Sequence, residues 1–312
     1  MTVTAKWRSG WTSDRGRVRL ENQDRVLVDD ELGVFLVVDG LGGHAAGEKA
    51  AETALEVIRG ELSRLEGGAR QRVRQAIAAA NNRICDLADE NETWRGMACV
   101  LTLAVMDQDR VVVGHVGDSR LYLFWNGAMH KLTSDHSPVG EREERGELTE
   151  QEAMLHPRRH EVFRNLGSRR RKPDEDDFVE IKEFQFKPDA AMLLCSDGLS
   201  DAMTAAEMTE LIEKYDGDPG KVARDLADAA NQAGGNDNIT AVFVAGSQFI
   251  GAASPAMGQA RVRHSITRPR TSAAEPAYKP ARFVRLGRGL TCRVAFLVYG
   301  FVIGVALALA WR

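Results

Sequence analysis

Hydrophobic and polar residues are distributed along the chain in two patterns, one typical of strands and one of amphipathic helices. Short apolar runs separated by turn residues predict strands at 24–30, 33–38, 99–106, 110–116, 120–125, 178–185, 190–195 and 239–245. Apolar positions recur at helical spacing in 45–65, 69–90, 204–214 and 219–233. Runs of strands precede and follow paired helices instead of alternating with single helices. The pattern therefore favours an α+β fold of antiparallel sheets with helices layered outside.

One long segment, 138–177, is polar, highly charged and poor in core residues, which predicts short helices and a mobile flap. The segment carries Arg158, Arg159 and Arg164, then a basic run at 169–172 and an acidic run at 174–177. Such runs are usually solvated and paired with each other. The alternative is that the basic part attracts phosphorylated peptides.

The composition changes near residue 249, which predicts a folded part at 1–248, a flexible basic linker at 249–293 and a transmembrane helix at 294–311. The last segment has eighteen consecutive uncharged residues, and a helix of that length is about 27 Å long. A buried or peripheral helix would show a polar face, and this one has none. Gly300 and Gly304 form a GxxxG spacing that is weakly indicative of helix dimerisation.

The charge distribution bears on location and partners. Residues 261–293 hold nine basic residues and one acidic residue, although the whole 312-residue chain has a net charge of −4. Arginines directly before the apolar span predict an inner-membrane, single-pass protein with its folded part in the cytoplasm. The acidic folded part argues against nucleic-acid binding. Four scattered cysteines without paired spacing favour a reduced compartment over a disulfide framework.

Four aspartates stand beside glycine or another small residue, and we expect each to follow a buried strand. They are Asp39 in VVDGLGGH (37–44), Asp118 in VGDSR (116–120), Asp197 in CSDGLSD (195–201) and Asp237 in GGNDNIT (234–240). A single Asp-Gly is an ordinary turn signal. Four such sites together predict a shared site for Mg²⁺ or Mn²⁺, because these hard cations prefer several oxygen ligands.

The order and sequences of these motifs, together with RGRVRLENQD (15–24) and KLTSDHSPVG (131–140), resemble those of the metal-dependent protein phosphatases of the PPM, or type 2C, family. The resemblance runs from about residue 11 to 244 and has a bacterial character, because Leu41 stands where eukaryotic relatives commonly carry histidine. It implies two packed, mainly antiparallel sheets between helical layers. It also implies that residues 1–248 hydrolyse phosphoserine and phosphothreonine in proteins with a water held between two metal ions.

The resemblance also implies roles for individual residues. Asp39 would bridge two Mn²⁺ or Mg²⁺ ions with the carbonyl of Gly40 as a further ligand. Asp197 and Asp237 would complete the shell of one ion, and Asp118 would share a third, weaker site with Asp197. Arg19 would grip the substrate phosphate, since a guanidinium donates two parallel hydrogen bonds.

Three more residues would support the metals without binding them. Asp24 would orient water, and Asn238 would act beside Asp237. His44 has either a structural role or a role as proton donor to the leaving group.

The sequence leaves several functional alternatives open. The implied partners are phosphorylated proteins and a cognate Ser/Thr kinase. A pseudophosphatase would bind phosphoproteins without hydrolysis, and a phosphatase of the same fold could serve an anti-sigma partner-switching pathway. A cysteine phosphatase is disfavoured because no cysteine lies five residues before an arginine. A P-loop is disfavoured because Glu48 replaces its lysine.

Overall fold

The computed structural model describes residues 6–41, 45–64 and 66–251. The predicted transmembrane helix, the GxxxG glycines, nearly all of the predicted linker and His44 lie outside the described residues. Within the described ranges, no helix is both long enough and apolar enough to cross a membrane.

In the part of the chain that the structure describes, ten strands form two five-stranded sheets in which all strand pairs are antiparallel. One sheet has the order β1-β10-β9-β6-β7, made of Trp7–Asp14, Ile239–Gly246, Ala191–Cys195, Arg120–Trp125 and Ala128–Lys131. The other has the order β2-β3-β4-β5-β8, made of Arg25–Asp29, Val34–Leu41, Ala98–Asp107, Arg110–Val116 and Glu180–Gln185. The hairpin between β6 and β7 turns at Asn126-Gly127, and both residues have positive φ as a type I′ turn requires.

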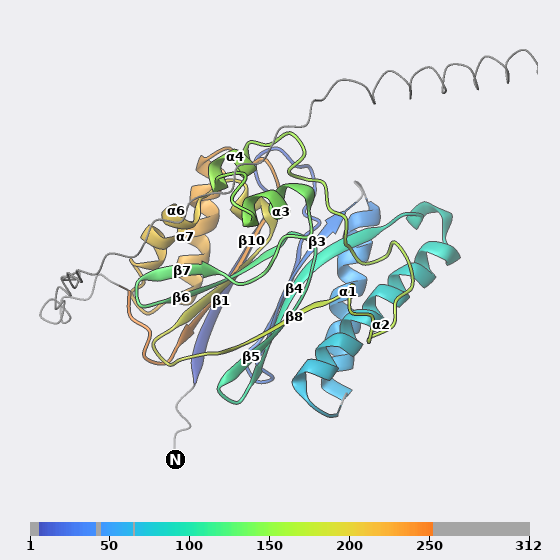
Figure 1. The fold of residues 1–312 in the computed structure, drawn as a ribbon, viewed down its shortest axis with the longest axis horizontal. Helices are drawn as coiled ribbons and strands as arrows, with labels where there is room; N and C mark the ends of the chain where they lie inside the picture. The colour runs from blue at the N-terminus through green and yellow to red at the C-terminus, as the bar shows by residue number, and fades with distance from the viewer. Residues whose placement is uncertain (1–5, 42–44, 65, 252–312) are drawn as a thin grey trace, which may run out of the picture. The chain divides into compact units, whose positions relative to one another are not determined.

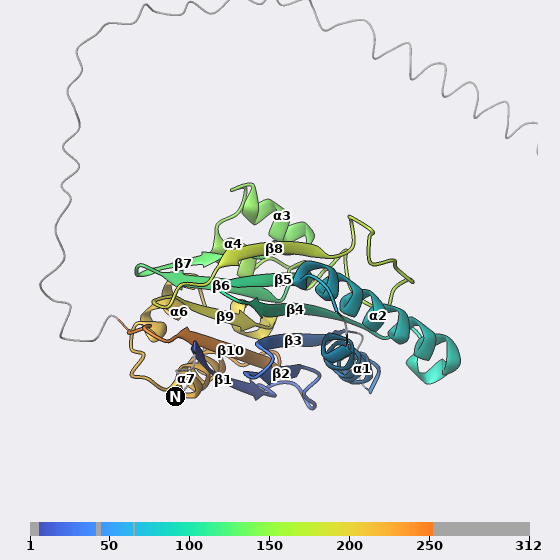
Figure 2. The ribbon, with the colours of Figure 1, turned by 90° about the horizontal axis from the view of Figure 1, so that it is seen from below.

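Helices cover the outer face of each sheet, which gives four layers (Figures 1 and 2). The helices α1 (Ala45–Arg64) and α2 (Ala69–Glu90) pack on β3, β4 and β5. The helices α6 (Ala205–Ile212) and α7 (Pro219–Gln232) pack on the other sheet. Three buried apolar clusters fill the two helix–sheet interfaces and the space between the sheets. The remaining helices are α3 (Pro138–Glu144), α4 (Glu150–Met154), α5 (Asp197–Ser200) and a short 3₁₀ turn at Glu92–Trp94.

The predicted fold class, two antiparallel sheets between helical layers, is confirmed. The strand β1 was not predicted, because it is an edge strand whose residues WRSGWTSD show no clear alternation. Phe249, the first residue of the predicted linker, is buried and packs against Phe124, Tyr215 and Phe243. Its burial shows that the aromatic core uses a residue beyond the end of β10.

Candidate active site

The register of the first sheet brings three of the four aspartates to one edge. Cys195, the last residue of β9, pairs with Arg120 on one side and with Ala241 on the other. Because β9 runs antiparallel to both neighbours, its end lies beside the beginnings of β6 and β10. Asp197 follows β9, Asp118 precedes β6 and Asp237 precedes β10. The expectation that every aspartate follows a strand is therefore wrong for Asp237, which comes between α7 and β10.

Asp39 comes from the second sheet and lies inside β3, opposite Val100, instead of beyond its end as expected. The strand continues through Gly40 to Leu41 because β4 supplies pairing partners up to Ala98. A β-carbon on Gly40 would stand 2.4 Å from the carbonyl oxygen of Gly47 in the first turn of α1. A glycine is needed here for backbone-to-backbone contact between β3 and α1.

A second close backbone contact joins Asp197 to Asp237. Asp197 is the first residue of α5, and a β-carbon on Gly198 would stand 2.0 Å from the carbonyl oxygen of Asn238. Only glycine allows the two segments to approach this closely. The glycine of the DG dipeptide thus allows the segments that carry Asp197 and Asp237 to lie side by side.

Asn238 holds the loop that carries Arg19. Its Oδ1 accepts from the N–H of Gln23 at 2.8 Å, and its Nδ2 donates to the carbonyls of Arg15 and Glu21 at 2.9 Å each. At the tip of that loop, Arg19 Nη2 donates to Asp237 Oδ2 at 2.6 Å. Arg19 is therefore in a loop, not on a strand, and it points at the carboxylate cluster.

Two buried histidines fix the turn that carries Asp118. The N–H of Gly117 donates to His136 Nδ1 at 2.9 Å, and the N–H of His136 donates back to the Gly117 carbonyl at 2.7 Å. His115 Nε2 donates to the same carbonyl at 3.0 Å. Burial lowers the pKa of both histidines, to about 2 for His136, so both rings are neutral at physiological pH. These histidines position the turn through their hydrogen bonds to Gly117.

Three of these carboxylates, those of Asp39, Asp118 and Asp237, lie near enough to negative neighbours for their ionisation to be disfavoured. Burial raises the pKa of Asp39 and Asp118 well above the usual range, and the negative charge of Asp197 raises both further. The pKa of Asp237 is also raised, first by burial and then by Asp197. Such mutual repulsion is relieved by bound cations, so the donor set fits hard divalent ions.

The surroundings of Asp24 give a second indication that the site is suited to bound cations. It is 3% exposed, and its Oδ2 accepts from Ser196 Oγ at 2.8 Å. Its Oδ1 is buried and makes no hydrogen bond to any residue that the structure describes. Burial raises the pKa of Asp24 to about 7. An orphaned carboxylate oxygen beside the cluster suits a water or an ion, in line with the predicted role in orienting water.

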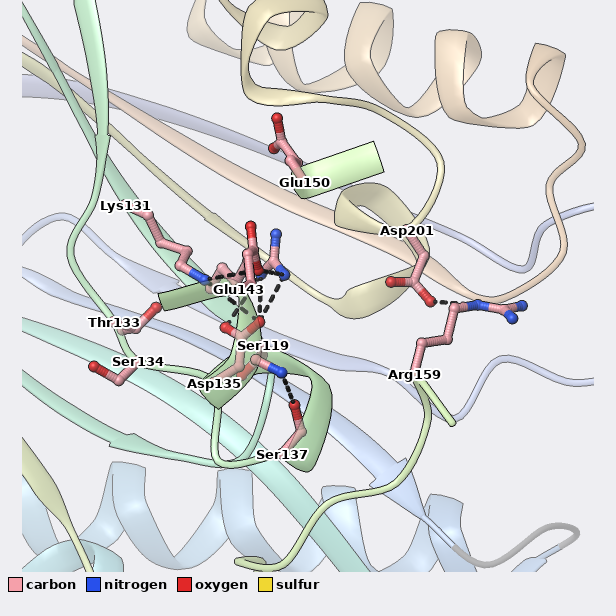
Figure 3. Close-up of polar contacts among 12 residues, drawn as sticks. Ser119, Lys131, Thr133, Ser134, Asp135, Ser137, Glu143, Glu150, Arg159 and Asp201 are labelled. Atoms are coloured by element: carbon pink, nitrogen blue, oxygen red, sulfur yellow. Dashed lines mark hydrogen bonds and ion pairs between the residues drawn. The ribbon is translucent and has the colours of Figure 1, made fainter. Parts of the chain in front are cut away.

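Beside Asp118, a buried ion-pair network organises the turn and α3. Arg120 donates to Asp135 from Nε at 3.0 Å and from Nη2 at 2.6 Å, and Nη2 also reaches Glu143 at 3.3 Å. Figure 3 shows Asp135 and Glu143 close together with Lys131 beside them, and Lys131 Nζ lies 3.5 Å from Asp135 and 3.3 Å from Glu143. Because Arg120 comes two residues after Asp118, the network anchors the strand that presents that carboxylate.

Two residues near the cluster were not singled out from the sequence. His160, from the 138–177 segment, places Nδ1 3.8 Å from carboxylate oxygens of both Asp197 and Asp201. Asp201 also accepts from Arg159 Nε at 3.1 Å (Figure 3). Asp201 lies four residues after Asp197, a spacing that would have identified it once α5 was recognised as a helix. His160 has no such local signal.

The charged runs of the 138–177 segment are largely paired, as the first interpretation of them predicted. The basic residues with acidic partners are Arg158 with Glu161, Arg159 with Asp201, Arg169 with Asp177, Arg170 with Asp86 and Asp89, and Arg171 with Glu175. The described cysteines, Cys85, Cys99 and Cys195, are buried. Burial raises the pKa of Cys195 to about 12, which leaves no thiolate to act as a nucleophile.

Comparison with known proteins decides the family. The profile of the family described as "Protein phosphatase 2C" matches residues 12–239. The chain belongs to this family. It is 36% identical over 244 residues to the serine/threonine phosphatase stp of Listeria innocua, an alignment that covers 74% of this chain and 93% of that protein. It is 31% identical over 241 residues to the serine/threonine protein phosphatase PstP of Mycobacterium tuberculosis, covering 77% of this chain and 45% of PstP.

Solved structures agree with this assignment. The catalytic domain of PstP in complex with two manganese ions matches with a TM-score of 0.67 at 29% identity, covering 77% of this chain and 97% of that one. Stp1 from Staphylococcus aureus matches with a TM-score of 0.69 at 26% identity, covering 78% and 97%. As a member of the protein phosphatase 2C family, this chain is an enzyme that depends on Mn²⁺ or Mg²⁺.

Proposed function

We propose that this protein 2C phosphatase hydrolyses phosphoserine and phosphothreonine in proteins and so reverses the action of a Ser/Thr kinase. The observation that carries the proposal is the convergence of the carboxylates of Asp39, Asp118, Asp197 and Asp237 with Arg19 beside them. The names of the relatives, serine/threonine phosphatases, support the substrate class.

Different residues of the site would bind the cations and the substrate. Asp39, the Gly40 carbonyl, Asp197 and Asp237 would hold two ions, and Asp118 with Asp197 would hold a third. Bound Mn²⁺ or Mg²⁺ supplies Lewis-acid activation of the phosphate ester and an activated nucleophile. Arg19 is half exposed, with 50% of its side chain accessible.

Because half of its side chain is accessible, Arg19 can turn its guanidinium from Asp237 to an incoming phosphate. Asn238 keeps the Arg19 loop in place through its three hydrogen bonds to backbone atoms. Asp24 stays buried beneath the cluster and can hold a water in position.

Phosphate release from phosphoserine, phosphothreonine, phosphotyrosine and phosphohistidine substrates tests the activity. The wild type should release phosphate from the first two in Mn²⁺, lose activity in EDTA and recover it when metal returns. Asp39→Asn should abolish turnover because it removes a charge shared by two ions. Full turnover by Asp39→Asn in chelator would refute the metal site. Tight binding of phosphoproteins by the wild type without hydrolysis would establish the pseudophosphatase.

We further propose that residues 294–311 anchor the enzyme in the inner membrane, with residues 1–248 in the cytoplasm. The proposal rests on the uncharged span and on Arg282, Arg285, Arg288 and Arg293 before it. Full-length protein should sediment with membranes and resist carbonate extraction. A variant that ends at Gly251, and so keeps Phe249 in the core, should be soluble and active. Recovery of the full-length protein in the soluble fraction would refute the anchor.

The same span supports a proposed weak helix dimer. Gly300 and Gly304 would let two helices approach closely. Gly300→Leu with Gly304→Leu should then reduce crosslinking of the membrane-bound protein. Equal crosslinking of the wild type and the double variant would contradict the dimer.

A further inference from the structure

A groove adjoins the site on the side of the 138–177 segment. Its volume is about 560 Å³, and Arg19 and Asp237 are among the residues that line it. We refer to it as the α4 groove. One wall comes from Met154 and Leu155 at the end of α4. Ala202 and Ala233 also line the groove.

The side chain of Leu155 lies outside the apolar core, so core packing does not explain why this residue is a leucine. Its surface is 83% exposed, although the preceding Ala153 is buried and Met154 is partly buried. A single exposed leucine is common on protein surfaces. This one differs because it lines a groove that leads to the phosphate-binding arginine.

The groove is held open by fixed contacts between its two sides. The N–H of Ala205, at the start of α6, donates to Glu150 Oε1 of α4 at 2.9 Å. Both helices begin with capping boxes, made by Thr149 with Glu152 and by Thr204 with Glu207. Nearer the carboxylates, Arg159 binds Asp201. The wall that carries Leu155 is therefore tied at both ends, and the groove exists before any ligand arrives.

From these features we propose that the α4 groove binds the polypeptide beside the phosphorylated residue and selects an aliphatic side chain there through Leu155. The inference rests on the proposed phosphoprotein phosphatase function. The occupant is the substrate because Arg19 and Asp237 themselves line the groove, so a peptide whose phosphate reaches Arg19 already lies beside the other lining residues. An aliphatic side chain set against Met154 and Leu155 removes apolar surface of both partners from water.

The test compares kcat/KM for phosphothreonine peptides that differ only in one flanking residue, leucine or serine, placed at each flanking position in turn. The wild type should prefer leucine at one or more positions by roughly five- to tenfold, the effect of burying part of one aliphatic side chain. Leu155→Ala should bring that ratio close to one, and Leu155→Met should retain it. Leu32→Ala is the matched control, because Leu32 is also an exposed leucine, at 51%, and does not line the groove.

The outcomes separate the inference from the function on which it rests. If the wild type hydrolyses neither peptide with Mn²⁺ present, the proposed function fails. If it hydrolyses both with equal kcat/KM, or if Leu155→Ala keeps the ratio, only the selection by Leu155 is refuted. If Leu155→Ala instead changes the sedimentation coefficient and leaves the ratio unchanged, the groove is an interface with a second copy of the chain.

Discussion

Replacing Arg120 with methionine should destabilise the protein strongly at neutral pH and much less in acid. The side chains of Arg120 and Asp135 are only 9% and 5% exposed, and Arg120 donates to both carboxylate oxygens of Asp135. Methionine keeps most of the volume but leaves Asp135 buried without its main partner. Breaking a buried pair in this way typically costs about 3–5 kcal/mol. Lys131 Nζ remains 3.5 Å from Asp135, so the lower end, near 3 kcal/mol, is expected.

The pH dependence follows from the pKa of Asp135. Burial alone would raise this pKa, but Arg120 and Lys131 outweigh burial and lower it. A carboxyl whose pKa is lowered by folding stabilises the protein above its unfolded pKa and loses that contribution as pH falls through its folded pKa. Without Arg120 the pKa of Asp135 rises, so the carboxyl takes up a proton at a higher pH than in the wild type. The stability gap between wild type and Arg120→Met should therefore narrow between pH 7 and about pH 4.

Urea unfolding of wild type and Arg120→Met in EDTA, at several pH values, measures the difference between their free energies of unfolding. Arg110→Met is the matched control, because Arg110 is 56% exposed and contacts Glu183 at 3.4 Å, a pair worth less than about 1 kcal/mol. Arg120→Met with Asp135→Leu should be more stable than Arg120→Met alone, since the buried carboxylate that loses its partner is then removed as well. A difference in the free energy of unfolding below about 1 kcal/mol at pH 7, or a difference that grows on acidification, would refute the reasoning.

The remaining predictions concern the Arg19 loop. Arg19→Ala should raise KM for phosphopeptides by about ten- to a hundredfold, as expected for loss of a charged hydrogen-bonded contact, and unchanged kinetics would show Arg19 to be a surface residue. Asn238→Ala should remove three hydrogen bonds to backbone groups and lower the free energy of unfolding by about 2–3 kcal/mol, or release the loop and raise KM. Asn236→Ala, the exposed control two residues away, should not change stability in urea unfolding, and equal losses in both variants would contradict the role of Asn238.

Most helices and strands could be predicted because their signal is local. In α2 the buried positions recur at helical spacing, and β4 is a continuous apolar run between turn residues. The strand β7 has only four residues and was not predicted. The other missed strand, β1, depends on β10, which lies more than 200 residues later and supplies its hydrogen-bonding partner. Its mixed burial reflects its place at the sheet edge. No window along the sequence contains both strands, so no local pattern could have identified the pair.

The residues of the site also differ in whether a local sequence signal could identify them. Asp39, Asp118, Asp197 and Asp237 could be found because each stands in a short motif with small neighbours. The residues that position them could not, since their roles depend on contacts across the fold. His136 acts through Gly117, nineteen residues earlier in the chain. Such partners become visible only when the register of the sheets is known.

The register also explains why the motifs contain small residues where they do. Placing β9 between β6 and β10 brings three chain segments to one edge, where their backbones must approach within a few ångströms. Gly198 allows the contact with Asn238, and Gly117 adopts a φ of +116° with no room for a β-carbon beside Val100. The glycines therefore set the spacing of the carboxylates and the aspartates supply their charge. A substitution at Gly198 should then be as damaging to metal binding as one at Asp197, although glycine offers no ligand.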